Sequence, residues 1–314
     1  MSAPIKKVCL IGANGTLGSV ILHELIKSHN EFSVSILQRN NSSSQQQYSA
    51  EQLRTISIAP ELPLDELEKA FAGFDAVIAS FPLSDVNQHL RAVEAAFRAG
   101  VRRYIPADYG SCDAASPLAQ ETLKLYRDKT MIRDKCESLA EGAKRDGGNF
   151  TWTSIICGHF FDFGLRDGLL HFDLEKHTAQ LLDGGKDKAS ASTLHRVAEA
   201  VVAILERPDT TANKALYVQS FNPSQLEILT SLEKATKTTW QRNEHSAKQY
   251  LQESKQRVDD GDKHAIEDVV FALGTMDADW MGKEGFAMEL LGLEDESLDE
   301  VVARTVMAYK KSMA

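Results

Sequence analysis

The most constraining feature of the sequence is a glycine string, Gly12-Ala13-Asn14-Gly15-Thr16-Leu17-Gly18, that directly follows an apolar run at residues 8–11. An amphipathic segment comes next, so the string lies between an expected strand and an expected helix. In that context one glycine permits a tight turn, one lets the backbone approach a pyrophosphate, and one lets the helix pack closely on the sheet. The phosphates would face the free N–H groups of the helix N-terminus. We therefore predict a dinucleotide-binding loop formed by Gly12, Asn14, Gly15, Thr16, Leu17 and Gly18.

A basic residue after the second expected strand indicates which dinucleotide would bind. The strand covers residues 32–37 and is followed by Gln38-Arg39-Asn40. NAD sites usually place Asp or Glu about twenty residues past the glycines, and no acid lies near this position. Arg39 can instead make a charge-assisted contact with a 2′-phosphate, and Asn40 opens a polar stretch, residues 40–47, that could add hydrogen bonds. NADP(H) is the predicted cofactor; in the alternative interpretation Arg39 is an exposed arginine at a strand end.

Alternating strand and helix patterns predict an α/β fold, a Rossmann-type doubly wound parallel sheet. Strands are expected at residues 8–11, 32–37, 55–58, 75–80, 103–106 and 152–156. A helix capped by Ser84 or Asp85 should end at Gly100, and one long helix should run over residues 118–144. We expect an NADP(H)-binding domain at residues 1–156 and a smaller, mostly helical substrate lobe at residues 157–314, interleaved with the first.

Composition narrows the classes of partner. The net charge of −10 argues against nucleic acid or an anionic membrane as a partner. No apolar run approaches the roughly 18 residues of a membrane span, and the early first strand leaves no room for a targeting peptide, so a cytoplasmic protein is expected. The four scattered cysteines indicate reduced thiols, and no cluster has metal-ligand spacing. The partner expected is a small-molecule substrate; the oligomeric state is open, with a homodimer among the alternatives.

Ligands of open parallel sheets sit at the carboxyl ends of the strands. Those ends carry Ser80-Phe81, Ala107-Asp108 and Gly158-His159-Phe160. None of the seven tyrosines has a lysine four residues later, so the Tyr-x-x-x-Lys proton donor of ordinary short-chain dehydrogenases is missing. A reductase built on this chain would need another proton source.

Four features follow one another in the order and at the spacing of a known protein family. They are the glycine string, Arg39, Arg103-Tyr104-Ile105-Pro106-Ala107-Asp108-Tyr109-Gly110 and Lys129-Thr130-Met131-Ile132-Arg133. The chain resembles the NmrA-like branch of atypical short-chain dehydrogenases, close to isoflavone reductases and phenylcoumaran benzylic ether reductases. Its sequence in the third of these features is typical of fungal members. The resemblance implies that Lys129 is catalytic. It also implies cofactor contacts from Ser80, Phe81, Ala107, Lys129, Gly158 and Phe160.

Each catalytic candidate has a simpler interpretation beside it. Lys129 could donate a proton as hydride arrives or hold the nicotinamide ribose, although most helix lysines are merely solvated. His159 could be a proton relay or substrate anchor, or a packed structural residue. Asp108 could contact a polar substrate or cap a turn.

Three functions remain in competition at this point. The first is an NADPH-dependent reductase of a small aromatic or polyketide-like secondary metabolite, with Lys129 as the proton donor. The second is an NmrA-like redox sensor that binds NADP(H) without turnover. The third is a non-redox enzyme, such as a cyclase, that keeps NADP(H) as a structural ligand.

Overall fold

A seven-stranded sheet organises the first half of the chain. The structure is a computed structural model and describes residues 3–28, 32–40 and 53–313. The sheet order is β11-β6-β5-β4-β1-β2-β3, and β1 to β6 pair in parallel. Its strands are β1 Lys7–Ile11, β2 Ser33–Arg39, β3 Arg54–Ile58, β4 Ala76–Ala79, β5 Arg103–Ile105, β6 Thr151–Ile156 and β11 Lys214–Tyr217. The order reverses between β1 and β4, which confirms the predicted doubly wound α/β fold and marks the switch point where ligands bind.

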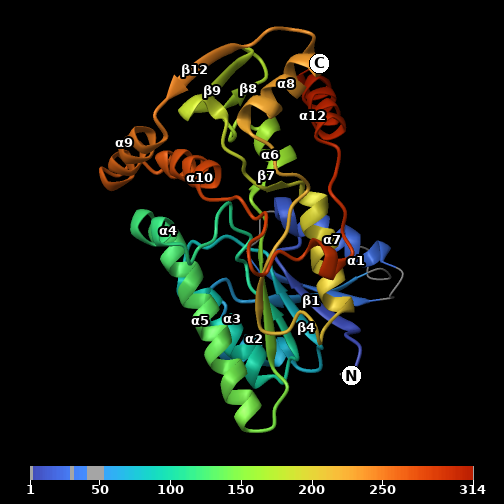
Figure 1. Cartoon of the computed structure of the whole chain (residues 1–314). Helices are drawn as coiled ribbons and strands as arrows, with labels where there is room; N and C mark the ends of the chain where they lie inside the picture. The colour runs from blue at the N-terminus through green and yellow to red at the C-terminus, as the bar shows by residue number, and fades with distance from the viewer. Residues whose placement is uncertain (1–2, 29–31, 41–52, 314) are drawn as a thin grey trace. The chain divides into compact units, whose positions relative to one another are not determined.

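Helices cover the sheet because side chains alternate along each strand. Cys9 and Ile11 point to one face, where they join a core with residues of α2 (Leu64–Phe71), α3 (Val86–Arg98) and α5 (Lys124–Arg145). Figure 1 shows these three helices together beside the sheet. Two further helices are α1 (Thr16–Lys27) and α7 (Leu194–Glu206). As predicted, the Asp85 side chain caps α3 and Gly100 follows its end with a positive φ.

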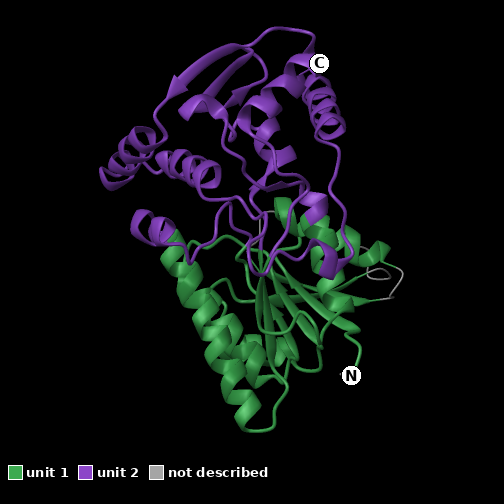
Figure 2. Cartoon of the chain, viewed as in Figure 1, with its two compact units in different colours: residues 1–108, 125–155, 197–216 green, residues 109–124, 156–196, 217–314 purple. Residues whose placement is uncertain are grey.

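The chain divides into two compact units, each made of several stretches (Figure 2). Unit 1 comprises residues 1–108, 125–155 and 197–216, and unit 2 comprises residues 109–124, 156–196 and 217–314. This division does not test the domain ranges predicted from the sequence, 1–156 and 157–314, which stay a prediction.

A buried arginine ties the late stretch 197–216 into unit 1. The Arg103 guanidinium donates to the hydroxyls of Thr151, Thr153 and Thr211 at 2.8–3.0 Å, and to the backbone carbonyl of Pro208. Burial lowers the pKa of Arg103 to about 10. Hydroxyl and carbonyl oxygens accept hydrogen bonds from the positively charged guanidinium of Arg103. These bonds join β5 to the segment after α7, and burial strengthens them.

Unit 2 contains helices and two small sheets. One sheet has the order β12-β9-β8 and the other pairs β10 with β7. Its elements are α4 Pro117–Thr122, β7 His159–Phe160, α6 Phe161–Arg166, β8 Phe172–Asp173, β9 Thr178–Leu182, η1 Asp183–Gly185, β10 Ala191–Ser192, α8 Gln225–Thr236, β12 Gln241–His245, α9 Ala247–Asp259, α10 Ala265–Met276, α11 Met288–Leu291 and α12 Leu298–Met313. The sequence predicted a mostly helical lobe but none of these small strands; β12, for example, is a polar run, QRNEH, with no apolar alternation.

The single long helix expected over residues 118–144 is wrong. The structure has α4 and α5 instead, separated by Leu123, whose backbone is extended at φ −127° and ψ 139°. Leu123 is only 5% exposed, so the break buries its side chain. Neither glycine nor proline marks the interruption, which explains why the helical period appeared continuous.

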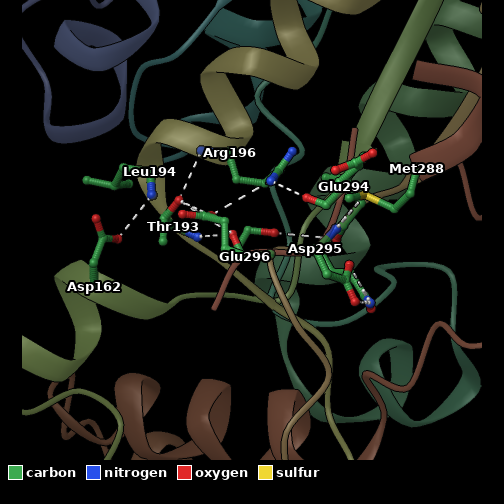
Figure 3. Close-up of polar contacts among 12 residues, drawn as sticks. Asp162, Thr193, Leu194, Arg196, Met288, Glu294, Asp295 and Glu296 are labelled. Atoms are coloured by element: carbon green, nitrogen blue, oxygen red, sulfur yellow. Dashed lines mark hydrogen bonds and ion pairs between the residues drawn. The ribbon is translucent and has the colours of Figure 1, made fainter. Parts of the chain in front are cut away.

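A polar network in unit 2 holds the segment between α11 and α12 (Figure 3). The Glu296 carboxylate accepts hydrogen bonds from the hydroxyls of Thr193, at 2.9 Å, and Ser220. Thr193 in turn accepts from the backbone N–H of Arg196, and Arg196 donates to the backbone carbonyl of Glu294 at 2.5 Å. One carboxylate therefore joins the segment to Thr193, just before α7, and to Ser220, in the stretch that follows β11.

Replacing Glu296 by Ala should leave two buried hydroxyls without their acceptor. We expect the free energy of unfolding to fall by about 1–3 kcal/mol in urea titrations. Glu294→Ala is the matched control, because it removes an exposed carboxylate but keeps the backbone carbonyl that Arg196 uses. Equal stability of the two variants would contradict the role given to Glu296.

Candidate functional site

The loop of residues 12–18, the glycine loop, lies at the switch point between β1 and β4. Gly12 has φ +87°, and a Cβ there would lie 2.1 Å from the backbone oxygen of Ser80. A Cβ on Gly18 would lie 2.0 Å from the backbone oxygen of Gly12. Both positions therefore admit only glycine, one for the turn against β4 and one for the approach of α1.

Gly15 differs from the other two glycines because it is exposed. A Cβ there would make one tight contact, 3.3 Å from the Gly12 oxygen, and one ordinary contact, 3.8 Å from the Ser80 oxygen, which small shifts of the loop could accommodate. The protein backbone therefore does not require glycine at this position, whereas a ligand lying on the loop would. No side chain caps the N-terminus of α1, which leaves its first N–H groups able to bind an anion.

The other predicted residues of the glycine loop differ in their exposure to solvent. Asn14 is half-buried and Thr16, the first residue of α1, is exposed. Leu17 is only 7% exposed and packs into the core, so it can reach a ligand mainly through its backbone.

Arg39, at the end of β2, is held by side chains from two other elements. Its Nη2 donates to Oε1 of Gln88 on α3 at 3.2 Å, and its Cζ lies 5.9 Å from the ring centroid of Phe81, just after β4. Among the residues that the structure describes, no carboxylate pairs with Arg39. Asn40 is exposed next to it, and residues 41–47 of the predicted polar stretch lie outside the described residues.

A histidine that the sequence analysis did not single out supports this corner. The His89 ring stacks on Phe81 with centroids 3.8 Å apart and planes 11° apart, and its Nε2 hydrogen-bonds the backbone carbonyl of Pro82 at 3.2 Å. Desolvation lowers the pKa of His89 to about 4, so the ring is neutral at neutral pH. The signal that could have identified Gln88 and His89 was their position in the first turn of α3, the helix that follows β4 along the chain.

Lys129 and Asp108 meet at the carboxyl end of β5. Lys129 Nζ donates to the backbone carbonyl of Asp108. The Asp108 carboxylate is 3% exposed and accepts from Arg133 Nε at 3.1 Å and Nη2 at 2.6 Å. Asp108 thus holds two basic residues on one face of α5: the Asp108 backbone carbonyl binds Lys129, and the Asp108 carboxylate binds Arg133.

This arrangement defines what the cluster can do chemically. An ammonium group has three donors, so Lys129 keeps donors for a ligand after contacting Asp108. The charge of Arg133 is compensated by Asp108, whereas the charge of Lys129 is not shared with a carboxylate in any contact that the described part of the chain shows. Ser80 and Ala107, at the ends of β4 and β5, are half-buried.

The predicted residues of unit 2 form a separate group. Gly158 is buried with φ +69°, and a Cβ there would lie 1.9 Å from the Ser190 oxygen, so a backbone contact explains this glycine. His159 Nε2 hydrogen-bonds the Phe271 carbonyl at 3.3 Å, and desolvation lowers the pKa of His159 to about 4. Phe160 is half-buried and pairs in register with Ser192.

His159 also lines a small apolar cavity of unit 2, of about 30 Å³. Three phenylalanines, Phe161, Phe172 and Phe271, are among the residues that line it. Gly274 makes the room for the imidazole, because a Cβ there would lie 2.3 Å from His159 Nε2. The cavity is about the size of one water molecule or one small substituent.

Over residues 3–28, 32–40 and 53–313, no group of three or more His, Cys, Asp or Glu side chains is arranged to hold a metal ion. In the same residues, no helix is both long and apolar enough to cross a membrane. All four cysteines are buried thiols.

Comparison with known proteins agrees with this architecture. The family model described as the NmrA-like family matches residues 4–294. Oxidoreductase aprR of Aspergillus flavus is 29% identical over 300 residues, which cover 95% of this chain and 97% of aprR.

Solved structures show the same fold at lower identity. AtPrR2 with NADP+ and (+)-pinoresinol has a TM-score of 0.75 and 16% identity, covering 97% of this chain and 100% of AtPrR2. The Citrobacter sp. triphenylmethane reductase complexed with NADP(H) has a TM-score of 0.68 and 20% identity, covering 95% and 99%. The fold, the glycine loop and the match over residues 4–294 lead to one conclusion: this chain belongs to the NmrA-like family.

Proposed function

We propose that the protein is an NADPH-dependent reductase of the isoflavone reductase-like type, acting on a small aromatic or polyketide-like secondary metabolite. The observation that carries the proposal is the placement of Lys129 at the end of β5, in the same unit as the glycine loop and Arg39. Relatives support the class of reaction, because aprR is named an oxidoreductase and two structural neighbours were solved with NADP+ or NADP(H).

The residues present fit this cofactor. The open face of Gly15 and the uncapped start of α1 suit a pyrophosphate, and Arg39 suits a 2′-phosphate. Ser80, Phe81 and Ala107, at the neighbouring strand ends, would border the rest of the dinucleotide. Gly158 and Phe160 of unit 2 are proposed as further contacts. NADPH, when bound, supplies a hydride to the substrate carbon.

The proposed task of Lys129 is to supply the matching proton. Its Nζ donates one hydrogen bond to the Asp108 carbonyl, which fixes the direction of the side chain. A remaining N–H would point at the substrate oxygen on which negative charge develops, and the proton would pass to that oxygen. Asp108 acts here by holding Lys129 and Arg133, and neutral His159 is proposed to anchor the substrate by a hydrogen bond.

The experiment that tests the proposal follows absorbance at 340 nm. Purified protein with NADPH is mixed with a panel of aromatic carbonyl, enone and benzylic ether compounds. Loss of absorbance in proportion to product supports the reductase. Cofactor that binds but is never consumed, while a product still forms, would favour non-redox chemistry. Binding without any product would favour a sensor of NADP(H).

Replacing Gly15 by Val should separate cofactor binding from folding. The valine side chain would occupy the open space on the loop, so we expect NADPH affinity to fall more than tenfold in fluorescence titrations. Stability should change by no more than about 1 kcal/mol, a typical cost at a helix N-cap. Gly18→Val is the contrasting control, because its Cβ would collide with the Gly12 oxygen and destabilise the fold. An unchanged NADPH titration for Gly15→Val would refute the role of the loop.

Replacing Arg39 by Ala should remove the preference for the 2′-phosphate. A hydrogen bond to a charged group contributes about 1.5–3 kcal/mol, so NADPH affinity should fall by roughly 10- to 150-fold. NADH affinity should remain nearly constant, because NADH lacks that phosphate. Equal losses for the two cofactors, measured by calorimetry, would contradict the assignment.

Replacing Lys129 by Ala should abolish turnover while the cofactor still binds. General acid catalysis typically contributes a factor of about 10²–10⁴, so turnover should fall at least a hundredfold. Lys135→Ala is the matched control on the same helix, since Lys135 pairs with Glu94 at 2.6 Å, away from Asp108. Normal turnover in Lys129→Ala, measured at saturating NADPH, would remove Lys129 from the mechanism.

A further inference from the structure

The first turn of α3 reaches toward the end of β2. Asp85 caps the helix, with Oδ1 accepting from the backbone N–H of Asn87 at 2.9 Å. The backbone N–H of Gln88 donates to the Asp85 carbonyl at 3.2 Å, which fixes the backbone of Gln88. From this fixed position Gln88 Oε1 accepts from Arg39 Nη2 at 3.2 Å. A helix cap therefore anchors the residue that orients Arg39.

A stack of flat groups lies at the same corner. Arg39 Cζ is 5.9 Å from the Phe81 centroid, and Phe81 stacks on the fully buried ring of His89. His89 donates from Nε2 to the Pro82 carbonyl, so its ring cannot turn without losing that bond. Because this imidazole is neutral, it supports Phe81 without adding a positive charge beside Arg39.

We propose that Gln88 is a positioning residue that sets the preference for a 2′-phosphorylated adenosine by holding Arg39 in its binding orientation. The inference rests on the proposed function and adds a determinant outside the residues that would touch the phosphate. An arginine side chain loses rotamer entropy when a ligand fixes it, and ordering the side chain before binding lowers that cost.

The chemistry of an amide suits this role better than that of a carboxylate. A neutral amide oxygen accepts one N–H of the guanidinium and leaves its full positive charge available to a phosphate. The guanidinium has five N–H donors, and the contact with Gln88 engages one of its nitrogens. A carboxylate at position 88 would compensate the charge of Arg39 and repel the phosphate.

The test measures binding rather than turnover, by calorimetry at constant salt. The ligands are NADP+ and NAD+, together with adenosine 2′,5′-bisphosphate and AMP, which differ only in the 2′-phosphate. We expect Gln88→Ala to weaken NADP+ and the bisphosphate by about 2- to 10-fold, the range for ordering one side chain. NAD+ and AMP should be unaffected. Asn87→Ala, the exposed neighbour on α3, is the control and should leave all four affinities unchanged.

Gln88→Glu is a second variant that separates orientation from mere contact. It keeps an acceptor at the same reach but adds a negative charge, so we expect NADP+ affinity to fall more than in Gln88→Ala. Thermal unfolding of each variant shows whether the protein remains folded. A gain in NADP+ affinity for Gln88→Glu would overturn the inference.

The outcomes for the two proposals are distinguishable. If Arg39→Ala loses the preference for NADP+ and Gln88→Ala keeps it, the positioning role is wrong while the proposed cofactor stands. If Gln88→Ala weakens all four ligands equally, Gln88 is structural and the inference fails. If Arg39→Ala itself keeps the preference, the proposed NADP(H) site fails first.

Discussion

Backbone contact between β1, α1 and β4 is the constraint on which the rest of the site depends. Gly12 lies against the Ser80 carbonyl, and Gly18 lies against the Gly12 carbonyl, at separations that exclude any side chain. These contacts fix where α1 begins, and so where its first N–H groups point. They also hold the end of β4, from which Phe81 projects toward Arg39 and His89.

Three basic groups in unit 1 are held in two chemically different ways. Arg133 pairs with the buried carboxylate of Asp108, which compensates its charge. Arg39 is held by an amide, and Lys129 by a backbone carbonyl, and neither acceptor carries a charge. A neutral acceptor orients a cationic side chain without compensating its positive charge. On this basis Arg39 and Lys129 are suited to meet an anionic or electron-rich ligand, whereas Arg133 is suited to hold α5 in place.

The sequence predicted local features well because each has a local cause. The glycine loop between strand and helix, and the Asp85 cap of α3, follow from residue type and spacing. The capping box of α8, in which Ser224 and Glu227 bond reciprocally, is equally local.

Features that depend on distant partners were not predictable. The extended conformation of Leu123 buries an apolar side chain, which no helical period reveals. The strand β12 is polar and is defined by its parallel pairing with β9. Each of its residues pairs with the β9 residue 63 positions earlier (241 − 178 = 63), from Gln241 with Thr178 to His245 with Leu182. Likewise, Gln88 lies 49 residues from Arg39, so their contact exists only once β2 and α3 are in place.

The three catalytic candidates differ in whether they have a proton to give. His159 is neutral at neutral pH, since its pKa is lowered to about 4, and its Nε2 proton is directed to the Phe271 carbonyl. The Asp108 carboxylate is paired with the Arg133 guanidinium, from which its Oδ2 accepts two hydrogen bonds, so it serves there as an acceptor. The Lys129 ammonium has three protons and uses one on the Asp108 carbonyl. Of the three, Lys129 is therefore the group that we propose as the proton donor, with Asp108 as the residue that aims it.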